Sequence, residues 1–282
     1  MDCPADAYAD DTTLTESGAT VDEIGTKMSK NCELVSNWMM ENKLKLNADK
    51  THLMTVGTKE RLRLQNSKVE VVMDGISLTE SKDKVETLLG CQIEPGLKWH
   101  KQVDELLKKL QKRLTGLANL RSIIPFNLRK RITEGMFMSV LAYCIPVFGG
   151  CDKFEIEAIQ VMQNQAARLV THLPMITSRK EIFSAAGWMT VNQLICYHSA
   201  LSTYRIRQSQ EPKYLSNIMS RDNRADRIIV PFTDLTLAKK SYCFRAAEKW
   251  NSIPESIRKM PKIGQFKFHL KKWILRSIEQ FV

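Results

Sequence analysis

The spacing of apolar residues divides the chain into two parts. Up to about residue 95 they come in short runs bounded by turn residues, whereas from Trp99 onward they recur every three or four positions over long stretches. Short bounded runs are typical of strands, and the longer recurrence is typical of amphipathic helices. The pattern therefore predicts an α+β fold, with a small β unit at the N-terminus followed by a mostly α-helical region.

The clearest local signal in the first part is Asp74-Gly75, which separates two β-rich runs within residues 69–79. This dipeptide favours a type I′ hairpin turn. Residues 88–93 predict a third strand of the same unit. Residues 43–47 predict a short extended segment, and residues 50–57 predict another strand, which ends at Gly57.

A helix is predicted over residues 20–42, where Thr20 and Glu23 have capping-box spacing. Its expected apolar face consists of Ile24, Met28, Val35, Trp38 and Met39.

A longer helix is predicted over residues 102–122, because a stripe of leucines and one valine lies opposite a face rich in lysine and arginine. The stripe comprises Val103, Leu106, Leu107, Leu110, Leu114, Leu117 and Leu120. Pro125 ends this helix. Further helices are predicted at 128–143, 155–170, 178–186, 190–208, 234–250 and 263–280.

The net charge of +11 is unevenly distributed. The first 26 residues hold seven acids and neither lysine nor arginine, whereas residues 98–131 hold ten basic residues against Asp104 and Glu105. A polyanion such as a nucleic acid is the natural partner of a basic surface of this kind. The alternative from charge alone is a basic, well-solvated surface without a partner.

Two classes of protein are not favoured by the sequence. No apolar run reaches the roughly 18 residues of a membrane span, and no signal-peptide pattern follows Met1. We therefore expect a nuclear or cytoplasmic protein that is not secreted and has no membrane partner.

The seven cysteines form no CxxC pair, so we expect buried thiols rather than a metal site or disulfides.

An acid pair lies close to the N-terminus, in the stretch Tyr8-Ala9-Asp10-Asp11. Mg²⁺ prefers hard oxygen ligands, and two-metal phosphoryl transfer uses clustered carboxylates to activate a hydroxyl and stabilise departing pyrophosphate. As four residues alone, the stretch is more typical of a surface turn.

Five further blocks follow the acid pair in a fixed order. They are Trp38-x₃-Asn42-Lys43-Leu44-Lys45-Leu46-Asn47-x₂-Lys50-Thr51, Leu89-Gly90, Leu97-Lys98-Trp99-His100, Gln160-x₂-Gln163-Asn164-x-Ala166-Ala167-Arg168 and Ala246-Ala247-x₂-Trp250-Asn251-x₂-Pro254. With the acid pair, they make the chain resemble the C-terminal part of non-LTR retrotransposon reverse transcriptases of the jockey-like kind. The resemblance covers essentially the whole chain.

The resemblance implies an organisation in three parts. Residues 1–95 would be a partial palm that includes a primer-grip hairpin at 85–93, residues 96–150 a helical thumb, and residues 151–282 a helical C-terminal region. The implied activity is that of an RNA-directed DNA polymerase, a nucleotidyltransferase encoded by a transposable element. Its partners would be an RNA template with a DNA primer, or an RNA–DNA hybrid.

The resemblance also implies roles for individual residues. Asp10 and Asp11 would be catalytic ligands of Mg²⁺, and Lys50 would be the general acid that protonates pyrophosphate, although a solvated lysine is the alternative for Lys50. The nucleic-acid-binding residues would be Tyr8, Lys101, Lys108, Lys109, Lys112, Arg113 and Arg121.

The family pattern also requires a further metal-binding aspartate on a strand upstream of the acid pair, and fingers. Only seven residues precede Tyr8, so we expect an incomplete catalytic site that binds Mg²⁺ weakly and a truncated chain that is inactive alone. Two alternatives stay open: a non-catalytic, basic, helical nucleic-acid-binding module, and a piece of a larger product that supplies the missing parts.

Overall fold

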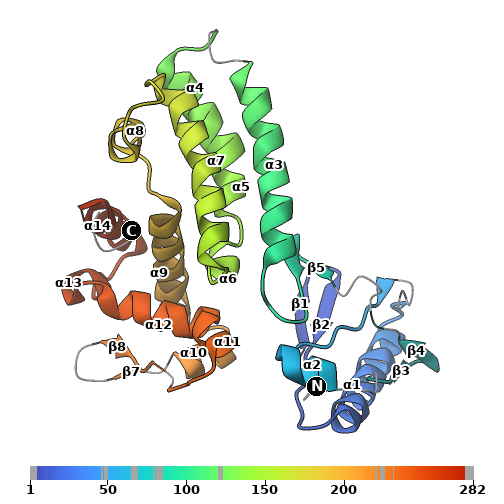
Figure 1. Cartoon of the computed structure of the whole chain (residues 1–282). Helices are drawn as coiled ribbons and strands as arrows, with labels where there is room; N and C mark the ends of the chain where they lie inside the picture. The colour runs from blue at the N-terminus through green and yellow to red at the C-terminus, as the bar shows by residue number, and fades with distance from the viewer. Residues whose placement is uncertain are drawn as a thin grey trace. The chain divides into compact units, whose positions relative to one another are not determined.

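The computed structural model of the chain (Figure 1) describes residues 5–45, 47, 50–64, 69–78, 80, 85–119, 123–219, 221–222, 226–230 and 232–276. It is a mixed α+β structure, mostly helical with small antiparallel sheets, and the predicted class is confirmed at this level. The chain divides into two compact units, Met1–Leu97 and Lys98–Val282, and each has buried apolar residues of its own. No described helix is long and apolar enough to cross a bilayer.

The first unit contains two helices and three hairpins among its described residues. In chain order they are β1 (Ala5–Tyr8), β2 (Asp11–Leu14), α1 (Val21–Glu41), α2 (Lys59–Leu64), β3 (Val71–Met73), β4 (Ile76–Leu78), β5 (Glu86–Leu88) and β6 (Cys91–Ile93). Each hairpin is a separate two-stranded antiparallel sheet, so no larger sheet forms among these residues.

The core of the first unit forms where α1 packs against β3. Its buried members are Cys32, Val35, Leu53, Val69, Val71 and Met73. Gly25 permits the close approach of α1, because a Cβ there would lie 2.8 Å from the carbonyl oxygen of Glu70. The predicted N-cap is confirmed, since the Thr20 hydroxyl accepts from the Glu23 amide at 3.2 Å.

The type I′ prediction at Asp74-Gly75 is confirmed, because both residues have positive φ, 49° and 75°. Leu89 and Gly90 have the same signature, with φ of 47° and 77°, between β5 and β6. The prediction that residues 88–93 add a third strand to the hairpin of β3 and β4 is therefore wrong, because they contain the turn and the second strand of a separate hairpin formed by β5 and β6.

Three other expectations for this unit are wrong. Residues 50–57 form no strand; within them Leu53 makes only an isolated parallel bridge to Glu80. Trp38 was predicted to face the core, but it is 46% exposed. The buried face of α1 includes the polar residues Asn31 and Ser36. The extended segment predicted at 43–47 is not a strand at its described residues, and Leu46 lies outside them.

The second unit is helical apart from one short hairpin. Its described elements are α3 (His100–Ala118), α4 (Phe126–Thr133), η2 (Glu134–Met138), α5 (Ser139–Ala142), α6 (Ile145–Phe148), α7 (Lys153–Thr171), α8 (Arg179–Ala186), α9 (Val191–Ser209), α10 (Lys213–Ile218), β7 (Arg221–Asp222), β8 (Arg227–Ile228), α11 (Thr236–Lys240), α12 (Tyr242–Ser252), α13 (Glu255–Arg258) and α14 (Ile263–Arg276).

Helices α3 and α7 pack side by side, and α9 packs against α6, α7, α12 and α14 (Figure 1). Local sequence fixes where several of these helices begin. Capping boxes start α7 at Asp152, α8 at Ser178 and α9 at Thr190. In each case a side chain at the cap and another three residues later satisfy main-chain amides that a helix start leaves unpaired.

The helices predicted at 155–170, 178–186 and 190–208 are confirmed to within a few residues. Two others are interrupted. The helix predicted at 128–143 contains the π-helical segment η2, and the one predicted at 234–250 is divided at Ser241, whose side chain caps α12. Leu120 and the last four residues of the helix predicted at 263–280 lie outside the described residues.

Candidate nucleic-acid interface

The acid pair lies at the tip of the hairpin formed by β1 and β2. Tyr8 pairs with Asp11, so Ala9 and Asp10 form a two-residue turn in which Ala9 has a φ of 54°. Both carboxylates are exposed, as is the Tyr8 ring. A tight turn thus projects two acids into solvent, where they can reach an ion or substrate from outside the hairpin.

The described residues do not complete a metal centre at this tip. Their single group of at least three closely spaced histidine, cysteine or carboxylate ligand atoms is formed by His100, Asp152 and Glu155 in the second unit. Asp10 and Asp11 are therefore not joined by a third described ligand within such a group. Two exposed carboxylates alone are a weak site for Mg²⁺, which also needs substrate phosphates or further acids.

Lys50 is exposed and lies in a turn, where its amide donates to the Asn47 carbonyl at 3.2 Å. Among the described residues, no hydrogen bond or ion pair links it to the acid-pair hairpin. The general-acid role implied by the resemblance therefore stays a prediction.

Helix α3 carries the candidate interface, and its two faces differ sharply. Val103, Leu106, Leu110, Leu114 and Leu117 are buried. They face the rest of the helical unit, including α7 and α5. The lysines Lys101, Lys108, Lys109 and Lys112 are exposed. Burial of one face fixes the helix in place and leaves the cationic face in solvent.

Three of these lysines lie along one line of the helix. At about 100° per residue, Lys101, Lys108 and Lys112 fall within about 20° of a common line, nearly opposite Leu110. At about 1.5 Å rise per residue they are separated along the axis by about 10 Å and 6 Å. This row is suited to a linear polyanion that runs along the helix.

The row includes one acid that partly offsets its charge. Glu105 accepts from the Lys108 ammonium at 2.7 Å, and this hydrogen bond and the lysine's charge lower the pKa of Glu105. The same contact raises the pKa of Lys108. Water and salt screen an exposed pair of this kind, so Lys108 can exchange Glu105 for a phosphate.

Three of the basic residues counted in the sequence do not extend this row. Arg113 is half-buried and donates to the Met136 carbonyl at 3.0 Å. Arg129 is buried and donates to the Val170 carbonyl at 3.0 and 2.7 Å, at the end of α7. Arg121 lies outside the described residues. On α3 itself the exposed cations are therefore the four lysines, and Lys98 and Arg131 are exposed outside this helix.

The cluster of His100, Asp152 and Glu155 was not expected from the sequence. Glu155 is buried; one of its oxygens lies 2.5 Å from His100 Nδ1 and the other accepts from the Asp152 amide at 2.8 Å. Asp152 in turn pairs with Lys240 at 2.5 Å. Since protein groups already use these ligand atoms, the geometry is that of a helix cap tied to α3, and it is not evidence for Mg²⁺.

The block that begins at Gln160 holds elements of the second unit together. The buried Gln160 side chain accepts from the Val191 amide at 2.8 Å and donates to Gln163 at 3.0 Å. Gln163 donates to the Met189 carbonyl at 2.9 Å. These amides thus join α7 to the start of α9.

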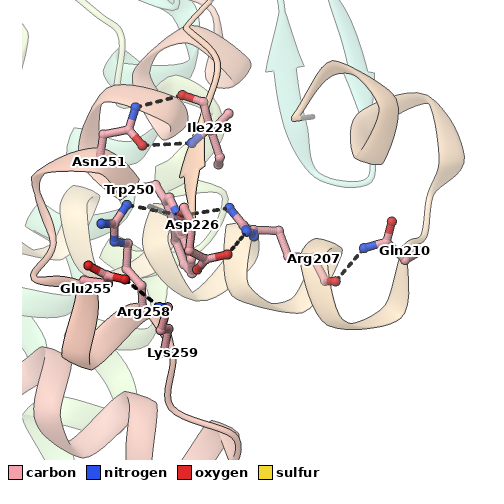
Figure 2. Close-up of polar contacts among 9 residues, drawn as sticks. All are labelled: Arg207, Gln210, Asp226, Ile228, Trp250, Asn251, Glu255, Arg258 and Lys259. Carbon is pink, nitrogen blue, oxygen red and sulfur yellow. Dashed lines mark hydrogen bonds and ion pairs between the residues drawn. The ribbon is translucent and has the colours of Figure 1, made fainter. Parts of the chain in front are cut away.

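The block around Trp250 has a comparable role. The Asn251 side chain makes two hydrogen bonds with the main chain of Ile228, at 2.9 and 2.8 Å, and Trp250 Nε1 donates to the Asp226 carbonyl at 3.1 Å (Figure 2). The sequence singled out Trp250 and Asn251, but the buried Arg207 and Arg258 beside them were missed. An arginine in a helical sequence carries no local signal that it will be buried.

Comparison of the chain with protein-family models, with curated proteins and with solved structures found no match. The functional assignment therefore depends on the residues and their geometry.

Proposed function

We propose that the chain belongs to an RNA-directed DNA polymerase of the non-LTR retrotransposon type, and that α3 binds the phosphate backbone of its template–primer. The acid-pair hairpin is then the part of the palm that holds metal, and the region of α3 is part of the thumb. The observation that carries the binding function is the row of lysines opposite the buried leucine face of α3.

The row suits the backbone of a nucleic acid for two physical reasons. Lysine ammonium groups on flexible stems adapt to phosphates without reading a base sequence. Counterions released from the strand then supply a large part of the binding free energy, which makes the affinity dependent on salt. We therefore expect binding to single strands and RNA–DNA hybrids with little sequence preference.

Binding measured against salt concentration tests this proposal. If Lys101, Lys108, Lys109 and Lys112 each contact a phosphate of a single strand, log K should fall against log salt with a slope of about −3. The variant Lys108→Ala/Lys109→Ala/Lys112→Ala should reduce the magnitude of that slope by about 2 and weaken binding. Its melting temperature should change little, since the buried face is intact and alanine favours helices.

A matched control is available on α14. The variant Lys267→Ala/Lys271→Ala/Lys272→Ala removes the same charge from another helix of the same unit and should keep most of the affinity. Equal losses in the two variants would show that net charge alone drives binding. Absence of binding at low salt would exclude the proposal.

The catalytic part of the proposal predicts an inactive isolated chain. Because the described residues offer Asp10 and Asp11 no third ligand, we expect no template-dependent incorporation of deoxynucleotides with Mg²⁺ or Mn²⁺. Incorporation that disappears in Asp10→Ala would contradict this expectation. It would also mean that another acid, such as Asp6, completes the site.

The second candidate is a basic helical module that binds nucleic acid without catalysis. It is favoured by the same gap in the metal site and makes the same salt prediction. The two candidates differ in what happens when the missing upstream palm strand and fingers are added to the chain. Incorporation of deoxynucleotides that then appears and depends on Asp10 would support the polymerase and exclude the module.

A further inference from the structure

A pocket of about 360 Å³ lies in the second unit, beside the loop that contains Asp226. Helix α9 supplies Arg207, α12 supplies Trp250, and Arg258 and Lys259 come from the end of α13 (Figure 2). The pocket is remote in sequence from the lysines of α3. Nothing in the proposed function uses it.

Most of the charges around this pocket are paired. Arg207, which is buried, forms an ion pair with the Asp226 carboxylate and lies over the Trp250 ring at 4.9 Å from its centroid. Lys259, which is exposed, pairs with Glu255 at 2.5 Å. These contacts match two cations to two carboxylates.

The charge that remains is on Arg258. Only 6% of this residue is exposed, yet no described carboxylate lies within 4.0 Å of its guanidinium. One of its NH groups donates to the Asp226 carbonyl at 3.2 Å. The buried Nε–H has no hydrogen-bond acceptor among the described residues.

An arrangement of this kind is costly without an additional partner. A buried donor that lacks an acceptor loses its hydration without compensation, and a buried cation that lacks an anion loses more. Burial accordingly lowers the pKa of the Arg258 guanidinium, although the nearby Asp226 charge opposes that change. An anion that contacts the remaining NH groups of the guanidinium from the pocket would supply the missing negative charge.

We propose that this pocket binds a phosphate group through Arg258 and Lys259, with Arg207 held behind them by Asp226 and Trp250. A guanidinium presents NH groups in a planar fork that matches phosphate oxygens. The ammonium of Lys259 can exchange its exposed ion pair with Glu255 for a contact to the same phosphate. Asp226 and Glu255 limit the net charge and thus favour one phosphate over a longer polyanion.

The phosphate has two possible sources, a small molecule such as a free nucleotide or the terminal phosphate of a strand. The pocket volume exceeds that of a bare phosphate, so there is room for the sugar attached to it. The proposal is independent of α3, since binding here does not require the α3 lysines.

The test uses the full chain and inorganic phosphate. At matched ionic strength, phosphate should raise the melting temperature of the protein above its value in chloride, and this increase should follow a binding curve as the phosphate concentration rises. In Arg258→Gln the apparent affinity should fall about tenfold or more, as expected for loss of a charge-assisted hydrogen bond. The control variant Arg179→Gln removes an exposed arginine that pairs with Glu157 elsewhere on the unit, and its apparent affinity for phosphate should not change.

Lys259→Gln keeps the proposal testable if Arg258→Gln does not fold. Lys259 is exposed, so its replacement should leave the fold intact but weaken phosphate binding. A wild-type protein that shows no specific effect of phosphate, or the same effect in both pocket variants, would overturn the proposal and leave Arg258 a purely structural contact to Asp226.

Competition then distinguishes the two sources. A 5′-phosphorylated oligonucleotide that displaces phosphate more strongly than its 5′-hydroxyl counterpart would support the end of a strand. A nucleoside monophosphate that displaces it as strongly would support a free nucleotide. Either outcome should be lost in the pocket variants, and displacement that survives in both of them would count against this site.

Discussion

The two units differ in how the residues proposed for function are supported. In the first unit the acid pair lies on a two-stranded hairpin, and every residue of β1 is exposed. In the second unit the α3 lysines lie on a helix whose opposite face is buried. All of the largest fully buried side chains among the described residues belong to the second unit.

This difference shows what each part needs from its surroundings. A hairpin with so little buried surface obtains limited stability from its own contacts, and its unpaired edges remain open to other strands. The α3 face is held by a large apolar core and needs no further support to present its charges. The acid pair should therefore depend on its context more strongly than the lysine row does.

The largest expected effect comes from a truncation in the core of the second unit. Phe266 is fully buried, and its ring stacks on those of Tyr204 and Trp250, with ring centroids 4.4 and 5.8 Å apart. Phe266→Ala should lower the free energy of unfolding of that unit by about 3–5 kcal/mol. Urea unfolding followed by tryptophan fluorescence measures this, since four of the five tryptophans lie in the second unit.

Val71→Ala is the matched truncation in the core of the first unit. If the two units are separate in stability, it should leave the fluorescence transition of the second unit in place. A common shift of both units in either variant would show one cooperative fold and would contradict the comparison.

A local difference in stability should be visible in amide exchange. Amides within residues 5–14 should exchange orders of magnitude faster than those in the middle of α7, because the hairpin can open without disturbing a core. Hydrogen–deuterium exchange read by mass spectrometry provides the comparison. Equally slow exchange in the two segments would mean that the hairpin has partners that these contacts do not explain.

The smallest expected effect is a pH dependence confined to the second unit. Burial, with a smaller effect from Arg205, lowers the pKa of His198 below its usual 6.5. As the pH falls below about 6.5, His198 becomes protonated in the unfolded chain before it does in the folded chain. The unfolded state therefore binds more protons, and the free energy of unfolding decreases as the pH falls. Urea unfolding at pH 7.5 and 5.5 should show a smaller loss in His198→Gln than in the wild type; equal losses would exclude this cause.

The sequence predicted those parts of the fold that local rules determine. The helices α7, α8 and α9 were predicted to within a few residues, and their capping boxes show that local sequence fixes where they begin. The dipeptide Asp74-Gly75 was sufficient to predict a type I′ turn. Residues 50–57 had strand-like composition but lack a neighbouring strand to pair with, except at Leu53. A strand is specified by its partner, and a single sequence does not reveal that partner.

The candidate site was predictable to a similar extent. Periodicity alone separated the buried leucines of α3 from its exposed lysines, whereas the half-buried position of Arg113 depends on the distant Met136 carbonyl. The pocket at Arg258 requires α9, α12 and α13 to meet, and contacts between helices far apart in sequence leave no local pattern.

Lysine footprinting tests the central claim most directly. Acetylation of the full chain, with and without a saturating RNA–DNA hybrid at low salt, compares individual lysines by mass spectrometry. We predict that Lys101, Lys108 and Lys112 become protected, while Lys267, Lys271 and Lys272 on α14 react as before. Unchanged reactivity along α3 in the bound complex, or stronger protection on α14, would contradict the proposal that α3 binds the template–primer backbone.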